Sequence, residues 1–372
     1  MNNRLRTNAL ATASLLLVLT ACARQEAPPA AAAPAGSTAP AAVAAAPGEP
    51  CKLNLFIWSE YIDPEIVASF EKEFACKVTI DLYEDNESMM SKLQGGGTAL
   101  YDIVVPGQYL IPVMAKLGLL AELRHENIPN LANLDEKFVN PVYDPGNKYS
   151  AAYQWGTVGI YLRKQPGKAV DETWGLMFDK AKQYGSFLLM DSPREMLGSM
   201  AKYKGMSVNS TSLDDLRAQS AALGEAKQRS QGFEGGVGGK NKVLAKAVDA
   251  AVVYNGDAVR GMSDDPETYY FVPREGGVLW LDNLAVPAQA PHRDAAEKFI
   301  NYVLDARIGA QLSNFNQYAT PNKAAKAFIT PEDLANPAIY PSAEMMAKLE
   351  FVNDLGDTNK LYDEVWTQVK SK

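Results

Sequence analysis

Aromatic rings and carboxylates gather at several places where an apolar segment of the chain ends. The segments are 58–61 (Trp-Ser-Glu-Tyr), 106–109 (Pro-Gly-Gln-Tyr), 191–195 (Asp-Ser-Pro-Arg-Glu), 254–257 (Tyr-Asn-Gly-Asp) and 280–282 (Trp-Leu-Asp). An aromatic face attracts a cation, and each such contact contributes about 0.5–2 kcal/mol. A carboxylate supplies the matching negative charge. A linear diamine or triamine uses both, because its ends are charged and its methylene body gains from leaving water. These residue types therefore predict a site for a small organic cation.

Each of these residues also has a simpler structural interpretation. Ser192 and Glu195 match a helix capping box, with Pro193 at the first helical position. Trp58 and Trp280 could be core residues, and the acids of 254–257 and 280–282 could be helix caps or surface charges. The prediction of a binding site depends on their coincidence at successive strand ends.

The chain alternates between strand and helix patterns, which places these segments at one edge of a sheet. Asp63-Pro64-Glu65 combines an N-cap, a proline at the first helical position and an acid in the first turn. Gly235 to Gly239 lack the Lys-Ser/Thr of a phosphate-binding loop, so we interpret them as a flexible loop. In an open α/β sheet, ligands bind beyond the carboxyl ends of the strands. Strands are expected at 52–58, 78–82, 101–105, 159–163, 186–190, 250–253 and 278–284, and helices at 63–74, 87–93 and 111–117.

The composition limits the classes of function. The chain has 372 residues, of which 47% are hydrophobic and 22% charged, so it can bury a large core and is long enough for roughly two domains. Its net charge of −8 argues against nucleic-acid binding. Two histidines and three cysteines leave little material for a histidine-based triad, a zinc ribbon or an iron–sulfur cluster. We expect no cofactor and no resident metal.

The N-terminus has the pattern of an export signal. Arg4 and Arg6 precede the apolar segment 9–19, which is too short to span a bilayer. It ends in Leu-Thr-Ala-Cys22, which resembles a bacterial lipobox whose cysteine is diacylated; an ordinary signal peptide with an incidental Cys22 is the alternative. Residues 23–50 contain 13 alanines and 6 prolines and cannot form a core. We therefore predict a signal peptide at 1–22, a disordered tether at 23–50, and a protein in the periplasm that is anchored to the membrane by lipid.

Cys51 and Cys76 remain as a pair in an oxidising compartment. Each cysteine precedes an expected strand, and parallel neighbouring strands would place the two side by side. We predict a structural disulfide; two buried free thiols are the alternative.

Four motifs resemble the spermidine/putrescine-binding proteins of bacterial ABC importers. They are 55–64 (LFIWSEYIDP), 101–106 (YDIVVP), 276–282 (GGVLWLD) and 339–343 (IYPSA), and the resemblance runs from about residue 52 to the C-terminus. It implies a two-lobed periplasmic-binding-protein fold of type II, with hinge-connected open α/β sheets. It also implies a monomer that captures a polyamine and delivers it to a permease and an ATPase. The expected lobes are 52–156 with 281–326, and 157–280 with 327–372.

The resemblance also assigns roles to residues. Residues 58–61 would line the first wall, Glu195 would face them from the other lobe, Asp257 and Asp282 would pair with amines, and Trp280 would cover the alkyl chain. Gly107 and Tyr254 depart from the family pattern, where serine and tryptophan are usual, and Ser192 stands where spermidine-type proteins carry an aspartate. The preferred amine therefore stays open. The expected ligand-binding residues are Trp58, Ser59, Glu60, Tyr61, Tyr109, Glu195, Tyr254, Asp257, Trp280, Asp282 and Tyr318.

Parts of the sequence also fit three other functions. Tyr269 and Tyr270 could be the paired ligands of a ferric-ion-binding protein of similar fold, but neighbours in a strand point to opposite faces. Asp257 and Asp282 could form a glycosidase pair, yet no further catalytic group supports an enzyme. A polyamine sensor that signals through a membrane partner would have the same sequence features as a transport protein.

Overall fold

A computed structural model describes residues 50–371. The predicted signal peptide, the predicted lipidation site Cys22 and all but the last residue of the predicted tether lie outside the described residues. The described residues form one compact unit. Within the described part, no helix combines the length and the apolar character that crossing a bilayer requires.

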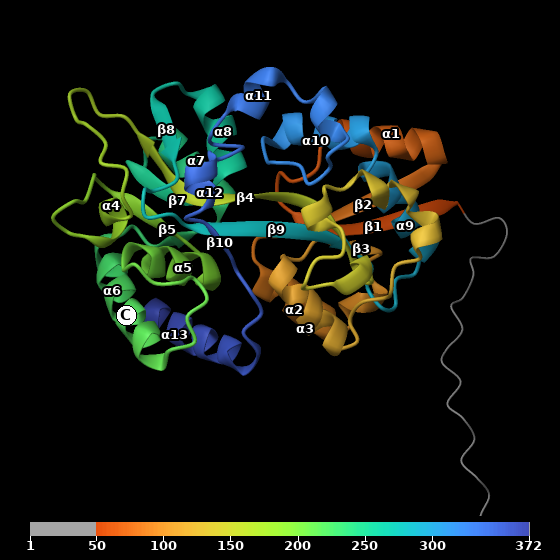
Figure 1. Cartoon of the computed structure of the whole chain (residues 1–372), viewed down its shortest axis with the longest axis horizontal. Coiled ribbons are helices and arrows are strands. Elements are labelled where there is room, and N and C mark those ends of the chain that lie inside the picture. The colour runs from red at the N-terminus through yellow and green to blue at the C-terminus, as the bar shows by residue number, and fades with distance from the viewer. Residues whose placement is uncertain (1–49, 372) are drawn as a thin grey trace, which may run out of the picture. The chain divides into compact units, whose positions relative to one another are not determined.

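The fold is a mixed α/β arrangement around one long sheet (Figure 1). The strands are β1 (Cys51–Trp58), β2 (Cys76–Tyr83), β3 (Ile103–Val104), β4 (Ser150–Arg163), β5 (Phe187–Met190), β6 (Phe233–Glu234), β7 (Ala250–Tyr254), β8 (Thr268–Phe271), β9 (Val278–Ala285) and β10 (Glu350–Phe351). The helices are α1 (Pro64–Phe74), α2 (Asn86–Gln94), α3 (Ile111–Lys116), α4 (Gly175–Phe178), α5 (Pro193–Tyr203), α6 (Leu213–Arg229), α7 (Gly236–Leu244), α8 (Asn255–Asp264), α9 (Arg293–Val303), α10 (Ala306–Asn316), α11 (Pro331–Ala335), α12 (Ala343–Met346) and α13 (Asn359–Ser371).

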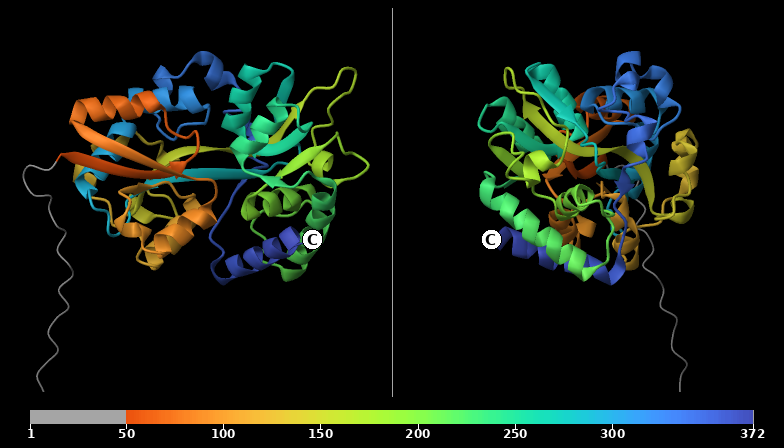
Figure 2. Two further views of the ribbon diagram at one scale, coloured as in Figure 1. Left: turned by 180° about the vertical axis from the view of Figure 1, so that it is seen from behind. Right: turned by 60° about the vertical axis from the view of Figure 1, so that its left-hand side comes forward.

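Two lobes share this sheet, whose strand order is β2-β1-β3-β9-β4-β7-β5-β6, with β10 beside β9 and β8 beside β4. We assign β1–β3, α1–α3, α9 and α10 to the first lobe, and β5–β8, α4–α8 and α13 to the second. Figure 1 shows β4 and β9 running through both lobes. In Figure 2 the C-terminal α13, in dark blue, lies along α6, in green, so the chain ends on the second lobe. The residue boundaries of the lobes stay a prediction.

The first βαβ unit forms as the sequence predicts. Asp63 caps α1 by accepting from the amide of Glu65 at 2.8 Å, and Ile66 and Phe70 are buried on the face that covers the sheet. β1 and β2 are parallel, with Cys51 opposite Cys76. The two cysteines form a disulfide, which confirms that prediction.

The crossing strand β4 is longer than expected, because the predicted strand 159–163 forms only its last part. Every residue from Ser150 to Leu162 is buried. Up to Thr157, β4 pairs with β9, and from Val158 it pairs with β7. Gly156 lies where the partner changes, and a side chain there would collide with the Asn255 amide and the Trp280 ring. The missing side chain lets the strand continue from one lobe into the other.

The prediction of a flexible loop at Gly235–Gly239 is wrong, because α7 begins at Gly236. A Cβ atom on Gly236 would lie 2.7 Å from the Tyr254 ring, and one on Gly239 would lie 3.2 Å from the Val253 side chain. These glycines therefore permit close packing of a helix on the sheet. Sequence reasoning read their lack of side chains as freedom of the backbone.

Candidate functional site

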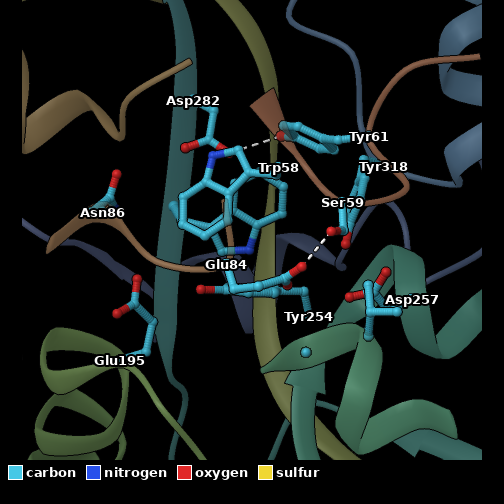
Figure 3. A pocket seen from close by; sticks show the side chains of 13 residues that line it. Trp58, Ser59, Tyr61, Glu84, Asn86, Glu195, Tyr254, Asp257, Asp282 and Tyr318 are labelled. Atoms are coloured by element: carbon cyan, nitrogen blue, oxygen red, sulfur yellow. Dashed lines mark hydrogen bonds between the residues drawn. The ribbon is translucent and has the colours of Figure 1, made fainter. Parts of the chain in front are cut away.

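A cavity of about 50 Å³ lies where the strand ends of both lobes meet (Figure 3). The first lobe contributes the loops after β1 and β2, and the second contributes the starts of α5, α7 and α8. Strand β9 forms part of the wall. The lining residues are Trp58, Ser59, Tyr61, Glu84, Asn86, Glu195, Gly236, Val237, Tyr254, Asp257, Trp280, Asp282 and Tyr318.

The structure brings together all of the predicted ligand-binding residues except Glu60 and Tyr109. Tyr109 lies behind the wall, and its hydroxyl accepts a hydrogen bond from the lining residue Asn86 at 3.2 Å. Glu60 points to two basic side chains that do not line the cavity. A direct contact with the ligand stays a prediction for every member of the set.

Sequence reasoning missed four lining residues, Glu84, Asn86, Gly236 and Val237. Glu84 and Asn86 directly follow β2, so the rule that drew attention to the other strand ends also applied to them. Gly236 and Val237 were missed because this segment was predicted to be a loop. In the structure they form the first turn of α7, which lies at the cavity wall.

Aromatic rings form a connected part of the cavity wall. Tyr318 contacts Trp280 and Tyr61 with ring centroids 5.0 and 5.4 Å apart, and Tyr254 lies 5.7 Å from Trp280. The Trp58 indole donates to the carbonyl of Val105 at 2.9 Å, which fixes its orientation. The rings meet edge to face, the arrangement that aromatic pairs prefer. The wall can thus cover an apolar chain and attract a cation without rearranging.

Asp282 and Glu195 are buried carboxylates whose hydrogen bonds come from hydroxyl groups (the open acidic pair). The Tyr61 hydroxyl donates to Asp282 at 2.9 Å, and the Ser192 hydroxyl donates to Glu195. Burial raises the pKa of Asp282 to about 8; the Tyr61 hydrogen bond opposes this rise and the charge of Glu195 adds to it. Burial also raises the pKa of Glu195. Within residues 50–371 neither carboxylate forms a salt bridge.

The helix-cap interpretation of Glu195 accounts for only part of its environment. Ser192 precedes α5, but its side chain caps no backbone amide. Its hydroxyl binds the Glu195 carboxylate instead. The neighbouring Arg194 donates to Asn353, Asn359 and Asn209 and not to Glu195. The carboxylate of Glu195 thus faces the cavity without a basic partner (Figure 3).

Glu60, Asp257, Lys240 and Arg260 form a second group, in which acids meet bases (the ion-pair cluster). Lys240 donates to Glu60 at 2.8 Å, and Arg260 donates to Glu60 at 3.0 Å and to Asp257 at 2.6 Å. Arg260 also donates to the carbonyl of Asn316 at 2.6 Å. Since Glu60 follows β1 and the bases lie on α7 and α8, the cluster joins the two lobes.

Electrostatics within the ion-pair cluster differ from those of the open acidic pair. Burial acts to raise the pKa of Glu60, but hydrogen bonds and charges from Lys240 and Arg260 lower it on balance. Burial raises the pKa of Asp257, and the charges of Arg260 and Lys240 oppose that rise. The acids of this cluster thus have positive partners supplied by the chain itself.

The tyrosine pair considered for ferric iron lies in β8, as predicted, and its two side chains point to opposite faces. Tyr270 is buried with its hydroxyl 3.0 Å from that of Thr157, whereas Tyr269 donates to Glu172. Among residues 50–371, no group of three His, Cys, Asp or Glu side chains is placed to hold a metal ion. The hydroxyl groups of the two tyrosines therefore do not face a common site.

Comparison with known proteins agrees with this fold. Residues 65–341 match the family of bacterial extracellular solute-binding proteins, and the chain belongs to this family. It is 31% identical to the spermidine/putrescine-binding periplasmic protein of Escherichia coli, over 86% of this chain and 91% of that protein. It is 30% identical to a putrescine/cadaverine-binding protein of Pseudomonas aeruginosa, over 86% and 93% of the two chains.

A solved structure extends the likeness to three dimensions. The spermidine/putrescine ABC transporter substrate-binding protein of Streptococcus pneumoniae superposes with a TM-score of 0.72 at 30% identity. The match covers 86% of this chain and 99% of that one. The predicted two-lobed periplasmic-binding-protein fold is confirmed.

Proposed function

We propose that this protein is an extracytoplasmic polyamine-binding lipoprotein that captures putrescine- or spermidine-type cations between its lobes and delivers them to an ABC importer. The observation that carries the proposal is the open acidic pair, two buried carboxylates without a basic partner, inside a wall of aromatic rings. Buried carboxylates need a counter-charge, and this cavity leaves that charge to the ligand.

The geometry suits a protonated amine at each end of a short chain. One ammonium group would pair with Asp282 and another with Glu195, while Trp58, Trp280 and Tyr318 cover the methylene groups. Closure of the lobes excludes water and strengthens each charge pair, because the local dielectric falls. The protein binds its ligand without changing it, acts as a monomer and passes the ligand to a permease and its ATPase.

The relatives named above support this ligand class, because their names state polyamine binding. The first experiment is isothermal calorimetry of the compact unit, residues 46–372, unfolded and refolded to remove any bound ligand. Putrescine, cadaverine, spermidine and spermine are titrated separately. We expect micromolar or tighter binding of at least one amine. Absence of heat with all of them would contradict the proposal.

The lipid anchor at Cys22 is a separate part of the proposal. It is supported by the lipobox-like Leu-Thr-Ala-Cys22 and by the 28-residue tract rich in alanine and proline that follows. Labelling growing cells with a radioactive fatty acid should mark the chain, and Cys22→Ser should abolish the label. A labelled Cys22→Ser chain, or an unlabelled natural chain, would contradict the anchor.

A further inference from the structure

The ion-pair cluster contains two acids, Glu60 and Asp257, that the sequence analysis predicts to bind the ligand. In the structure, basic side chains of the protein itself pair with both. Glu60 forms salt bridges with both Lys240 and Arg260, and Asp257 forms one with Arg260. The Lys240 side chain is only 6% exposed and that of Arg260 18%, so both bases are held in the protein and not in solvent. An ammonium group arriving there would find each carboxylate already paired.

The charges that remain for a ligand are those of the open acidic pair. Lys240 and Arg260 balance Glu60 and Asp257 one for one, which leaves Asp282 and Glu195. Glu84 also lines the cavity, but it is exposed to water and accepts from the Ser59 hydroxyl. Exposed charges interact weakly because solvent screens them. Two buried carboxylates match two ammonium groups.

On the Asp257 side of the cavity, the chain already supplies a cation. Arg260 lies 2.6 Å from one carboxylate oxygen of Asp257, and the backbone of Gly236 faces the other. Gly236 and Val237 belong to the first turn of α7 and line the cavity. The first turn of a helix carries a partial positive charge, which repels an ammonium group. Figure 3 shows Asp257 and Glu195 on opposite sides of Tyr254.

We infer that Lys240 and Arg260 are specificity-determining residues, built-in cations that restrict the cleft to a diamine and exclude the additional charge of a triamine. The inference rests on the proposed function and deepens it. The side chain of Arg260 stands in for the ammonium group that a longer polyamine would place against Asp257. Lys240 does the same for Glu60 at the rim.

The test is the ratio of spermidine to putrescine affinity, measured by calorimetry on residues 46–372. The natural chain should bind putrescine at least tenfold more tightly than spermidine. Arg260→Met and Lys240→Met keep much of the side-chain length and remove the charge. Each should raise the spermidine-to-putrescine affinity ratio, and Arg260→Met should raise it at least tenfold, because Arg260 contacts both acids.

Two further variants separate charge from structural damage. Lys242→Met, on the same helix α7, removes a lysine that pairs with Glu234 outside the cavity, and it should leave the ratio unchanged. Glu60→Gln combined with Lys240→Met removes one acid and one base together. This double variant should keep the spermidine-to-putrescine affinity ratio of the natural chain. Structural damage to the cavity wall would change that ratio.

The outcomes distinguish this inference from the proposed function. An unchanged ratio in both single variants, or tighter binding of spermidine by the natural chain, would overturn the inference and leave polyamine binding intact. Tighter binding of 4-aminobutyrate than of putrescine would also overturn it, because the two bases would then bind a ligand carboxylate. Failure of the natural chain to bind any amine would instead overturn the proposed function and this inference with it.

Discussion

Asp282 and Asp257 are both buried aspartates on the wall of one cavity, 8% and 3% exposed, yet their surroundings differ. Asp282 belongs to the open acidic pair and receives a neutral hydroxyl from Tyr61. Asp257 belongs to the ion-pair cluster and receives the guanidinium of Arg260. The protein pairs one carboxyl group with a cation of its own and gives the other only a neutral hydrogen-bond donor. Residue type and burial alone therefore do not identify a ligand-binding acid; its partner does.

The strongest test of this comparison is Asp282→Asn. A buried ammonium would lose its counter-charge, so putrescine affinity should fall by well over tenfold, equivalent to about 2–5 kcal/mol. Calorimetry measures the affinity, and circular dichroism verifies the fold. Asp191→Asn is the matched control, because Asp191 pairs with Lys370 outside the cavity and its loss should leave affinity unchanged. Equal affinities of Asp282→Asn and the natural chain would remove Asp282 from the site.

Cys51→Ser tests whether stability and binding are separate. The disulfide closes a loop of 25 residues, and its loss should lower the free energy of unfolding by about 3 kcal/mol in the chain-entropy model. Both groups of acids lie toward the opposite end of β1, so putrescine affinity should stay within about twofold, as expected for independent sites. Thermal melting and calorimetry give the two values. A large loss of affinity would show that the bridge positions the cavity.

The pH dependence of binding should report on the open acidic pair. The pKa of Asp282 in the ligand-free protein is raised to about 8, chiefly by burial, so the carboxyl is mostly protonated at pH 7. An ammonium group needs the ionised form, and binding should release a proton. Affinity should fall about tenfold per pH unit as the pH drops from 8 toward 6.

The same shift has the opposite effect on the ligand-free fold. Because the folded state keeps a proton that the unfolded chain loses at lower pH, this group's contribution to stability is lost as pH rises through about 8. Melting temperatures measured with and without putrescine at pH 6, 7 and 8 test both predictions: stability of the ligand-free protein should fall as the pH rises, and stabilisation by putrescine should increase. An affinity independent of pH across this range would contradict the role of Asp282.

Glu84→Gln should have the smallest effect. Glu84 lines the cavity but is exposed, and water screens its charge. We expect putrescine affinity to weaken by less than about threefold. A loss as large as that of Asp282→Asn would place Glu84 among the residues that bind the ammonium groups directly.

Much of the fold and part of the site follow from local sequence patterns. The cap at Asp63 and the apolar strands predict the first βαβ unit, and the strand-end rule places Trp58, Glu195 and Asp257 on one cavity. Tyr318 has no such local signal and was predicted only from family resemblance. The glycines of α7 gave a misleading signal, because the same residue serves both flexible turns and close packing.

The ion-pair cluster was beyond sequence reasoning for a different reason. Lys240 and Arg260 meet Glu60 across separations of 180 and 200 residues. No periodicity or spacing links residues so far apart, and lysine and arginine on a helix are usually solvated. Only the three-dimensional arrangement of the lobes shows that these two bases neutralise acids at the cleft.

The crossing of β4 and β9 also has a consequence for how the chain is made. Both β3 and β4 pair with β9, so the middle of the sheet lacks a strand until Ala285 has been synthesised. The early strands β1–β3 therefore join the rest of the sheet only when β9, which comes late in the chain, is present. Contacts between residues so distant in sequence form slowly. The finished sheet is thus assembled only after most of the polypeptide exists, an order compatible with export of the chain before it folds.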